Sequence, residues 1–147
     1  MTTVIRAAET KDVLVVKSFL GQANVSTKGL EEQIDHFVVM EDANGSLLGT
    51  LGIQKVEQDG LLRSLVISKE ADNTNILDMF RQILMLARDK DLQRLYLATN
   101  KIVSMEFFAL MGFSRKNIEE VPKHIIEAEH VVETLQMDET VVMEFVI

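Results

Sequence analysis

Residues 61–90, LLRSLVISKEADNTNILDMFRQILMLARDK, change their hydrophobic pattern partway along. Residues 61–68 are mostly apolar and include branched side chains, which is typical of a buried strand. Residues 69–75 are polar, and from Ile76 to Lys90 the apolar side chains recur at the i, i+3, i+4 and i+7 spacing of one helical face. The stretch therefore predicts a strand, a polar loop and a long amphipathic helix.

The segments around this stretch extend it into a mixed sheet. A strand is predicted at residues 95–99, and because a helical crossover joins parallel strands, we expect it to run parallel to the strand at 61–68. Turns at residues 42–45 and 58–60 join the preceding strands into an antiparallel meander. The other predicted elements are strands at residues 4–7, 37–40, 47–56 and 140–147, and helices near residues 13–20, 30–34, 103–111 and within 121–135. The predicted fold class is α/β (α+β): a mixed, mainly antiparallel sheet with helices on both faces, in a single domain over residues 1–147.

The composition of the chain suits a folded domain and excludes several kinds of chemistry. The chain has 147 residues, of which 47% are hydrophobic and 26% are charged, as expected for one globular domain. It contains no cysteine, so disulfides, thiolate zinc sites and a cysteine nucleophile are excluded. Its formal net charge of −8 disfavours phosphate neutralisation, and we therefore expect no nucleic-acid partner.

The two ends of the chain lead to expectations about its location and its oligomeric state. Residues 1–8 lack the basic and apolar segments of a secretory signal, and no apolar run is long enough to span a membrane. We therefore predict a cytoplasmic protein with no membrane partner. The apolar closing strand at residues 141–147 could pair with that of a second copy, so the sequence is compatible with a homodimer.

Two motifs resemble those of the GNAT superfamily of N-acetyltransferases. Residues 62–67, LRSLVI, are similar to the central strand of that family, and residues 107–113, FFALMGF, are similar to the aromatic-aromatic-x-x-x-Gly-Phe ending of its next-to-last helix. Residues 63–65 (RSL) and 120–122 (EVP) most resemble the acetyltransferase domain of N-acetylglutamate synthases. The order of predicted elements also matches, so the resemblance implies the GNAT fold over almost the whole chain and acetyl-CoA as the acyl donor.

The resemblance also implies where the cofactor binds. In that family the strand before the long helix splays from its parallel neighbour, and its backbone groups hold the pantetheine arm of acetyl-CoA. The family's pyrophosphate-binding loop and helix N-terminus correspond to residues 72–77 here. The cofactor-binding residues implied in this way are Leu65, Val66, Ile67, Asn73, Thr74, Asn75, Ile76, Asn100, Lys101 and Phe108.

The cofactor loop departs from the family pattern. Asp72 stands where the family has Arg or Gln, and its carboxylate would face an anion. Asn75 and Leu77 replace glycines that let the backbone approach the phosphates. We therefore expect the affinity for CoA to be weakened.

The residues that usually carry the proton chemistry are missing. Phe108 stands where many members have a Tyr that protonates the leaving thiolate, and it has no hydroxyl group. Leu61 or Leu62 stands where synthase-like sequences often have a Glu that serves as the base. Weaker candidates for a catalytic base are Glu57, Asp59 and His36.

Each of these candidates also has a purely structural interpretation. Glu57 and Asp59 would be solvated carboxylates of a turn, and His36 would be a surface or hydrogen-bonded histidine. His124 and His130 are interpreted in the same way. They lie six residues apart, which misses the i, i+4 spacing of helical metal ligands, and we predict no metal site.

Arg63 interrupts an otherwise apolar strand, and two interpretations stay open. It could bind the carboxylate of a substrate, because the planar guanidinium donors match a carboxylate. Alternatively, it points to the open face of the sheet and pairs with an Asp or Glu.

These observations favour an acetyl-CoA dependent N-acetyltransferase that acts on a small primary amine, such as an amino acid, by direct transfer. The alternative is a catalytically silent GNAT-fold protein with a regulatory or ligand-binding role, which the departures at Asp72 and Phe108 favour. A third hypothesis is a related α/β protein that binds another nucleotide or small metabolite. Whether the chain is an enzyme is left open by the sequence.

Overall fold

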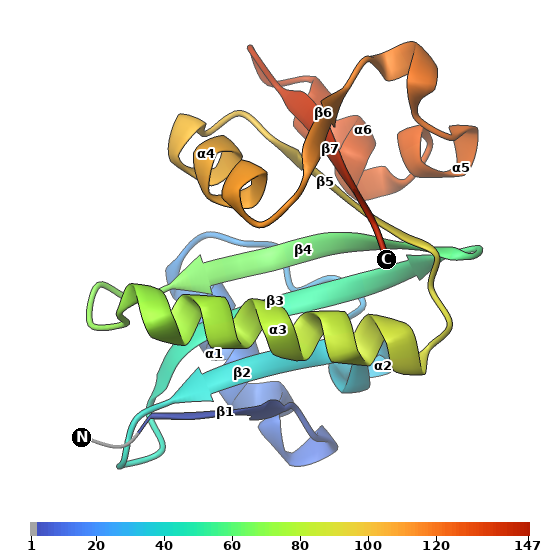
Figure 1. Ribbon diagram of the computed structural model, residues 1–147. Coiled ribbons are helices and arrows are strands. Elements are labelled where there is room, and N and C mark those ends of the chain that lie inside the picture. The colour runs from blue at the N-terminus through green and yellow to red at the C-terminus, as the bar shows by residue number, and fades with distance from the viewer. Residues whose placement is uncertain (1–2) are drawn as a thin grey trace. The chain divides into compact units, whose positions relative to one another are not determined.

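The computed structural model describes residues 3–147, which form a sheet of strand order β1-β2-β3-β4-β5-β7-β6 (Figure 1). The strands are β1 Val4–Ala7, β2 Phe37–Glu41, β3 Leu47–Val56, β4 Asp59–Ile67, β5 Arg94–Thr99, β6 Ser114–Lys116 and β7 Val141–Val146. The α-helices are α1 Val13–Gln22, α2 Leu30–Gln33, α3 Asn73–Asp89, α4 Ile102–Leu110, α5 Lys123–Ile126 and α6 Glu129–Leu135, and the 3-10 helices are Thr10–Asp12, Ile34–His36 and Ile118–Glu120. The pairs β1–β2, β2–β3, β5–β7 and β6–β7 are antiparallel, and β4 and β5 are parallel. The predicted fold class and the parallel crossover are therefore confirmed.

The chain divides into two compact units, which are described separately below. The first unit holds the described residues up to Gln54 together with Arg63–Asp89. The second unit holds Lys55–Leu62 together with Lys90–Ile147. The single domain expected over residues 1–147 stays a prediction.

In the first unit, helices lie on both faces of the strands. Figure 1 shows α3 in front of β2 and β3, with α1 and α2 behind them. On the α1 side, Val16 and Leu20 lie one helical turn apart and pack with Phe37 in one buried cluster. On its own buried side, α3 contributes Met79, Phe80, Ile83 and Ala87. Fully burying an aliphatic or aromatic side chain contributes roughly 1.5–3 kcal/mol, so these two clusters hold the helices to the sheet.

The second unit is built around β5 and β7. Tyr96 and Leu61 are fully buried in a cluster with Ile125 of α5 and Val131 of α6. The closing strand predicted at the C-terminus is confirmed as β7, but it pairs with β5 along one edge and with β6 through residues 142–144 along the other. Those residues do not form a free edge, so a homodimer through this strand loses support and dimerisation itself stays a prediction.

The turn before β4 lies earlier than predicted. The turn residues are Glu57 and Gln58, and Glu57 has a left-handed φ of 55°. Asp59 and Gly60, which were predicted to lie in the turn, are the first two residues of β4. Asp59 is therefore a strand residue, because the hairpin turn takes only two residues, and it is also buried.

Among residues 3–147, no helix is both long and apolar enough to cross a bilayer. The first two residues of the segment judged to lack a secretory signal lie outside the described residues. The cytoplasmic location stays a prediction.

Candidate functional site

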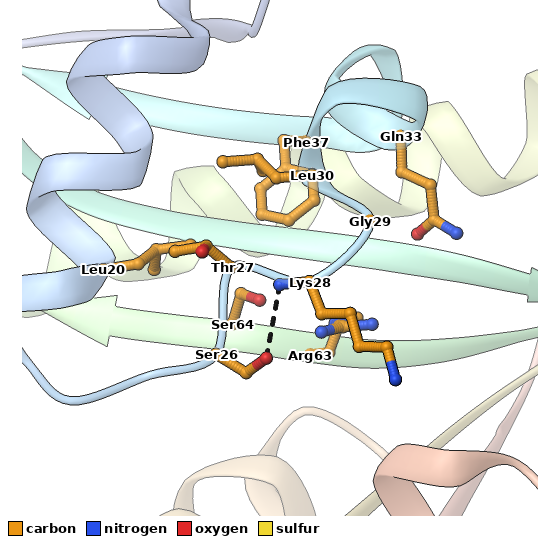
Figure 2. Close-up of a pocket in the computed structure, with 10 residues that line it drawn as sticks. All are labelled: Leu20, Ser26, Thr27, Lys28, Gly29, Leu30, Gln33, Phe37, Arg63 and Ser64. Atoms are coloured by element: carbon orange, nitrogen blue, oxygen red, sulfur yellow. Dashed lines mark hydrogen bonds between the residues drawn. The ribbon is translucent and has the colours of Figure 1, made fainter.

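A pocket in the first unit lies between the α1–α2 loop and β4. Figure 2 shows loop residues Ser26–Gly29 on one side of it and Arg63 and Ser64 of β4 on the other. The lining residues are Leu20, Ser26, Thr27, Lys28, Gly29, Leu30, Gln33, Phe37, Arg63 and Ser64. Two of these ten are cationic and none is acidic, so the lining favours an anion.

Arg63 is half-buried, and its Nη1 donates a hydrogen bond to Oε1 of Gln54 over 3.3 Å. This contact helps to orient the guanidinium of Arg63 at the pocket.

A backbone irregularity interrupts β4 at the pocket. Ser64 is buried and has a left-handed φ of 58°, which costs a residue other than glycine about 1–3 kcal/mol. Thr50, which is also buried, stabilises this conformation by donating from Oγ1 to the Ser64 carbonyl over 2.9 Å. A left-handed residue breaks the alternation of side chains along a strand, so Leu65–Ile67 do not continue the pattern that ends at Arg63.

A glycine allows β3 to approach this part of β4 closely. A Cβ atom on Gly49 would lie 3.1 Å from Cδ1 of Ile67 and 3.3 Å from the carbonyl oxygen of Val66. A larger residue would push against the backbone that carries Leu65, Val66 and Ile67, all of which are half-buried. Gly49 therefore helps to position the segment that the resemblance assigns to the pantetheine arm.

The parallel ladder between β4 and β5 is short. Within the second unit, Gly60 pairs with Leu95 and Leu61 pairs with Tyr96. The next residues of the two strands, Leu62 and Leu97, also belong to this unit, but no pair between them is found among the described residues. Within the second unit, the ladder between β4 and β5 therefore consists of these two pairs.

The N-terminus of α3 carries its own carboxylate. Asp72 precedes the first helical residue, and its Oδ1 accepts a hydrogen bond from the Asn75 amide over 2.8 Å. This is the geometry of an N-cap, and it explains why α3 begins at Asn73, three residues before the predicted start at Ile76. The Asp72 side chain is thus a cap of the helix as well as a charge facing any bound anion.

The first turn of α3 retains donors despite this cap. The Ile76 amide donates to the Asp72 carbonyl over 3.1 Å, and the Asn75 amide is taken by the Asp72 side chain. The amides of Asn73 and Thr74 have no acceptor within the helix, because the first amides of any α-helix lack one. Both residues are exposed, so two donors of this turn face solvent.

The other residues assigned to the cofactor lie around α4. Lys101 is exposed at the N-cap of α4, its amide donates to Oγ1 of Thr99 over 3.1 Å, and Asn100 beside it is half-buried. Phe108 is buried and makes edge-on contacts with Phe107 and Phe113, both with ring centroids 5.2 Å apart. Phe108 therefore fills an aromatic core of the second unit.

Of the candidate bases, Glu57 and Asp59 are brought together by a residue that the sequence analysis set aside. His124 Nε2 lies 2.7 Å from Oδ2 of Asp59, and its Nδ1 lies 3.3 Å from Oε2 of Glu57. The Asp59 side chain is 1% exposed and that of Glu57 is 65% exposed. The interpretation of Asp59 as a solvated turn carboxylate was wrong, whereas Glu57 is solvated as expected.

A tyrosine on the neighbouring strand completes the polar surroundings of Asp59. The Tyr96 hydroxyl donates to Oε2 of Glu144 over 2.6 Å, and these two residues are directly opposite each other on β5 and β7. Burial raises the pKa of the Tyr96 hydroxyl, and the negative charges of Glu144 and Asp59 raise it further. Tyr96 therefore stays protonated at neutral pH and acts as a donor to Glu144.

His36, the third candidate base, belongs to the first unit. Its Nε2 lies 3.7 Å from Oδ1 of Asp35, and its side chain is 20% exposed. Its buried Nδ1 has no hydrogen-bond partner among residues 3–147. Over the same residues, no group of three or more His, Asp or Glu side chains is arranged to hold a metal ion.

Comparison with known proteins gives one close sequence relative. No family model matches the chain. The chain is 36% identical over 141 residues to the uncharacterized protein YwlB of Bacillus subtilis (strain 168), and the match covers 95% of each protein.

Solved structures of similar fold are acetyltransferases or proteins bound to CoA. Rv2747 from Mycobacterium tuberculosis in complex with CoA matches 98% of this chain and 99% of its own with a TM-score of 0.77 and 23% identity. N-acetylglutamate synthase from Neisseria gonorrhoeae, complexed with CoA and N-acetyl-glutamate, matches 98% of this chain with a TM-score of 0.76 and 21% identity, but the match spans only 35% of that synthase. A GNAT family acetyltransferase from Staphylococcus aureus Mu50 has a TM-score of 0.73 and 16% identity over 97% of this chain and 98% of its own. At these identities the comparisons show a shared fold.

Proposed function

We propose that this chain transfers an acetyl group from acetyl-CoA to the primary amine of a small molecule that bears a carboxylate. The chain belongs to the same family as YwlB and has the GNAT fold. The observation that carries the proposal is the interruption of β4 at Ser64, whose left-handed φ of 58° directly precedes Leu65, Val66 and Ile67. Strand irregularities and left-handed residues of this kind are concentrated next to binding and active sites. The structural neighbours bound to CoA support this choice of ligand.

In the proposed reaction the chain supplies binding and orientation. Backbone groups of Leu65, Val66 and Ile67 would hold the pantetheine arm and polarise the thioester carbonyl. The amine nitrogen then forms a bond to the carbonyl carbon, the carbon–sulfur bond breaks, and CoA leaves as the thiolate. The acceptor nitrogen loses two protons, one from its ammonium form before attack and one as the amide forms, and the thiolate and solvent take them up. Holding the two reactants together supplies most of the rate enhancement.

We assign the acceptor to the pocket in Figure 2. Arg63 donates a hydrogen bond to Gln54, and Lys28 adds a second cationic side chain to the lining. A guanidinium binds a carboxylate with two parallel hydrogen bonds, which selects it over a neutral group. Amino acids are the acceptors that match this lining best.

The helix N-terminus fits a phosphate group only in part. The exposed amides of Asn73 and Thr74 suit an anion, and Asn100 and Lys101 would lie along the rest of the cofactor. The carboxylate of Asp72 opposes an anion at the same turn. We therefore propose that CoA binds more weakly than in members of the fold that carry glycines and an Arg or Gln in this loop.

The direct test is to measure CoA release from acetyl-CoA with a panel of amino acids and with the matching amines that lack the carboxylate. We expect turnover with at least one amino acid and a fall of about 10–100-fold in kcat/KM for its decarboxylated analogue. The Arg63→Met variant should lose the same preference, while Lys55→Met on β3, an exposed cation that does not line the pocket, should keep it. Equal kcat/KM values for the amino acid and its decarboxylated analogue would refute the pocket assignment.

A catalytically silent binding protein is the second candidate function. Two observations favour it: the Asp72 carboxylate at the helix N-terminus and the use of Phe108 as a core side chain. Calorimetry together with the CoA-release assay separates the candidates, because a silent protein could bind acetyl-CoA without releasing CoA. Saturable binding with no turnover over the whole panel would establish the second candidate and reject the first.

A further inference from the structure

Two hydrogen bonds tie the segment Leu65–Ile67 to β3, one at each end. Before the segment, Oγ1 of Thr50 donates to the carbonyl oxygen of Ser64 over 2.9 Å. After the segment, the amide of Ser68 donates to the carbonyl oxygen of Leu48 over 2.7 Å. All of these residues belong to the first unit. The backbone assigned to the acyl donor therefore lies between two fixed points on one neighbouring strand.

The two hydrogen bonds differ in what they depend on. The bond at Ser68 joins two backbone groups, so either residue could be replaced without removing it. The bond at Ser64 requires the hydroxyl of Thr50, whose exposed fraction is 0%. Thr50 and Ser64 are two of only three polar or charged residues that are buried among residues 3–147. Because a buried hydroxyl is costly unless it forms its hydrogen bonds, this contact is specific to the pair.

The conformation of Ser64 also affects the pocket. In a regular strand successive side chains point to opposite faces of the sheet. Arg63 and Ser64 are successive residues of β4, yet both line the same pocket (Figure 2). The left-handed φ of 58° at Ser64 breaks the regular alternation. Ser64 thus lines the acceptor pocket and directly precedes the donor segment.

Ser64 needs support to stay in this conformation. A residue with a side chain prefers negative φ, and a left-handed serine persists only where its surroundings determine it. In the ordinary extended conformation, Ser64 would point to the face opposite Arg63, and the residues after Ser64 would be turned as well. The hydrogen bond from Thr50 reaches the peptide unit of Ser64 at this point. It is therefore placed to favour the left-handed form over the extended one.

We propose that Thr50 is a positioning residue of the transfer, an inference that rests on the proposed function. By holding Ser64 in the left-handed conformation, Thr50 sets the backbone of Leu65–Ile67 for the acyl donor and keeps Ser64 beside Arg63 in the acceptor pocket. Thr50 acts through Ser64 and contacts neither reactant itself. It fixes the relation between the two binding places, and the rate of a transfer between two bound molecules depends steeply on that relation.

Thr50→Val tests this role directly. The substitution removes the hydroxyl and keeps the size and branching of the side chain, so the Ser64 carbonyl loses this donor. We expect the Kd for acetyl-CoA to rise about tenfold and kcat/KM for the amino acid to fall about 10–100-fold, because both binding places depend on Ser64. Thr50→Ser retains the hydroxyl and should keep the Kd within about threefold of wild type.

A double variant separates control of conformation from packing. Glycine adopts positive φ readily, so Ser64→Gly reduces the need for the hydrogen bond from Thr50. We expect Thr50→Val/Ser64→Gly to bind acetyl-CoA about three- to fivefold more tightly than Thr50→Val. If Thr50→Val alone does not fold, the double variant is compared with wild type, and its Kd should lie within about threefold of the wild-type value. Tenfold weaker binding by the double variant would overturn the inference.

Thr134→Val in the second unit is the matched control. It makes the same substitution and removes a hydroxyl that donates to the carbonyl oxygen of His130 over 2.7 Å. This variant should keep the wild-type Kd and kcat/KM even if its melting temperature falls. Both constants are measured well below the melting temperature of each variant, so that unfolding does not contribute to them.

The outcomes distinguish failure of this inference from failure of the proposed function. If wild-type protein acetylates an amino acid and Thr50→Val matches its Kd and kcat/KM, Thr50 is not a positioning residue and the proposed function still stands. If Thr50→Val and Thr134→Val are impaired equally, or if Ser64→Gly restores no affinity to Thr50→Val, the role of Thr50 is one of packing and the inference is overturned. If wild-type protein acetylates none of the panel, the proposed function fails and the role of Thr50 in transfer fails with it.

Discussion

Replacing Asp72 by Asn should tighten the binding of CoA. The Asp72 carboxylate accepts a hydrogen bond from the Asn75 amide in the first turn of α3, where the amides of Asn73 and Thr74 are exposed. An anion on those amides would lie about one helical turn, roughly 5–6 Å, from the carboxylate. Asn caps a helix about as well as Asp, so the substitution removes the charge and keeps the hydrogen bond.

The size of this effect follows from electrostatics. Two unit charges about 6 Å apart in water repel each other by about 0.7 kcal/mol, and a pyrophosphate with about two negative charges doubles this value. Salt screens roughly half of it at physiological ionic strength, which leaves about 0.7 kcal/mol, equivalent to roughly a threefold lower Kd. The free energy of unfolding should change by less than about 1 kcal/mol, because only the interaction with the helix dipole is lost.

Calorimetric titration of CoA into wild-type protein and Asp72→Asn measures this change. Asp89→Asn is the control, because it makes the same change of charge at the far end of α3, about 25 Å away and beyond the screening length of about 8–10 Å. Its Kd should stay within about twofold of wild type. An unchanged or higher Kd for Asp72→Asn would refute the view that this carboxylate opposes the cofactor.

Two further predictions concern stability. Gly52→Ala should destabilise the protein by about 1–3 kcal/mol in denaturant unfolding, because the new Cβ would lie 2.6 Å from the buried Phe37 ring. In Gly21→Ala on α1 the new Cβ meets nothing within 4 Å, so this variant should be more stable by about 0.5–1 kcal/mol. Equal effects of the two substitutions would contradict the packing described at Phe37. Hydrogen bonds from Arg6 lower the pKa of Asp12 from 3.8 to about 2, so the stability that this pair contributes is complete above pH 4 and is lost as the pH falls toward 2. Asp12→Asn should therefore cost about 1–2 kcal/mol at pH 7 and much less at pH 2, and an equal loss at both pH values would argue against the ion pair as the cause.

Local patterns in the sequence predicted most of the fold. The helical spacing after Ile76 and the strand-like segments before and after that helix predicted the parallel crossover. Such patterns can be read from one sequence because they involve residues that are close together along the chain. The start of α3 was missed by three residues, since the role of Asp72 as a cap was not recognised. The turn before β4 was misplaced, because Asp59 and Gly60 are common turn residues and nothing nearby in sequence indicates that Asp59 is buried.

The candidate site depends on contacts that one sequence does not reveal. His124 contacts Asp59, which lies 65 positions earlier in the sequence. The sequence analysis compared His124 only with His130, to ask whether the two have the spacing of helical metal ligands. Ser64 has a left-handed φ, and its carbonyl accepts a hydrogen bond from Thr50, which lies on another strand. Arg63 was found because a charge in an apolar strand is conspicuous, whereas its partner Gln54 was not predicted. Pairing of side chains over long separations requires the fold to be known first.

The central claim is that the backbone groups of β4 that follow the left-handed Ser64 hold the carrier of the acyl group. Backbone-amide NMR during a titration with acetyl-CoA tests it most directly. We expect saturable shifts at the amides of Leu65, Val66 and Ile67, with smaller ones at Asn73 and Thr74 in the first turn of α3. Saturation of shifts elsewhere in the chain, with these amides unmoved, would contradict the claim.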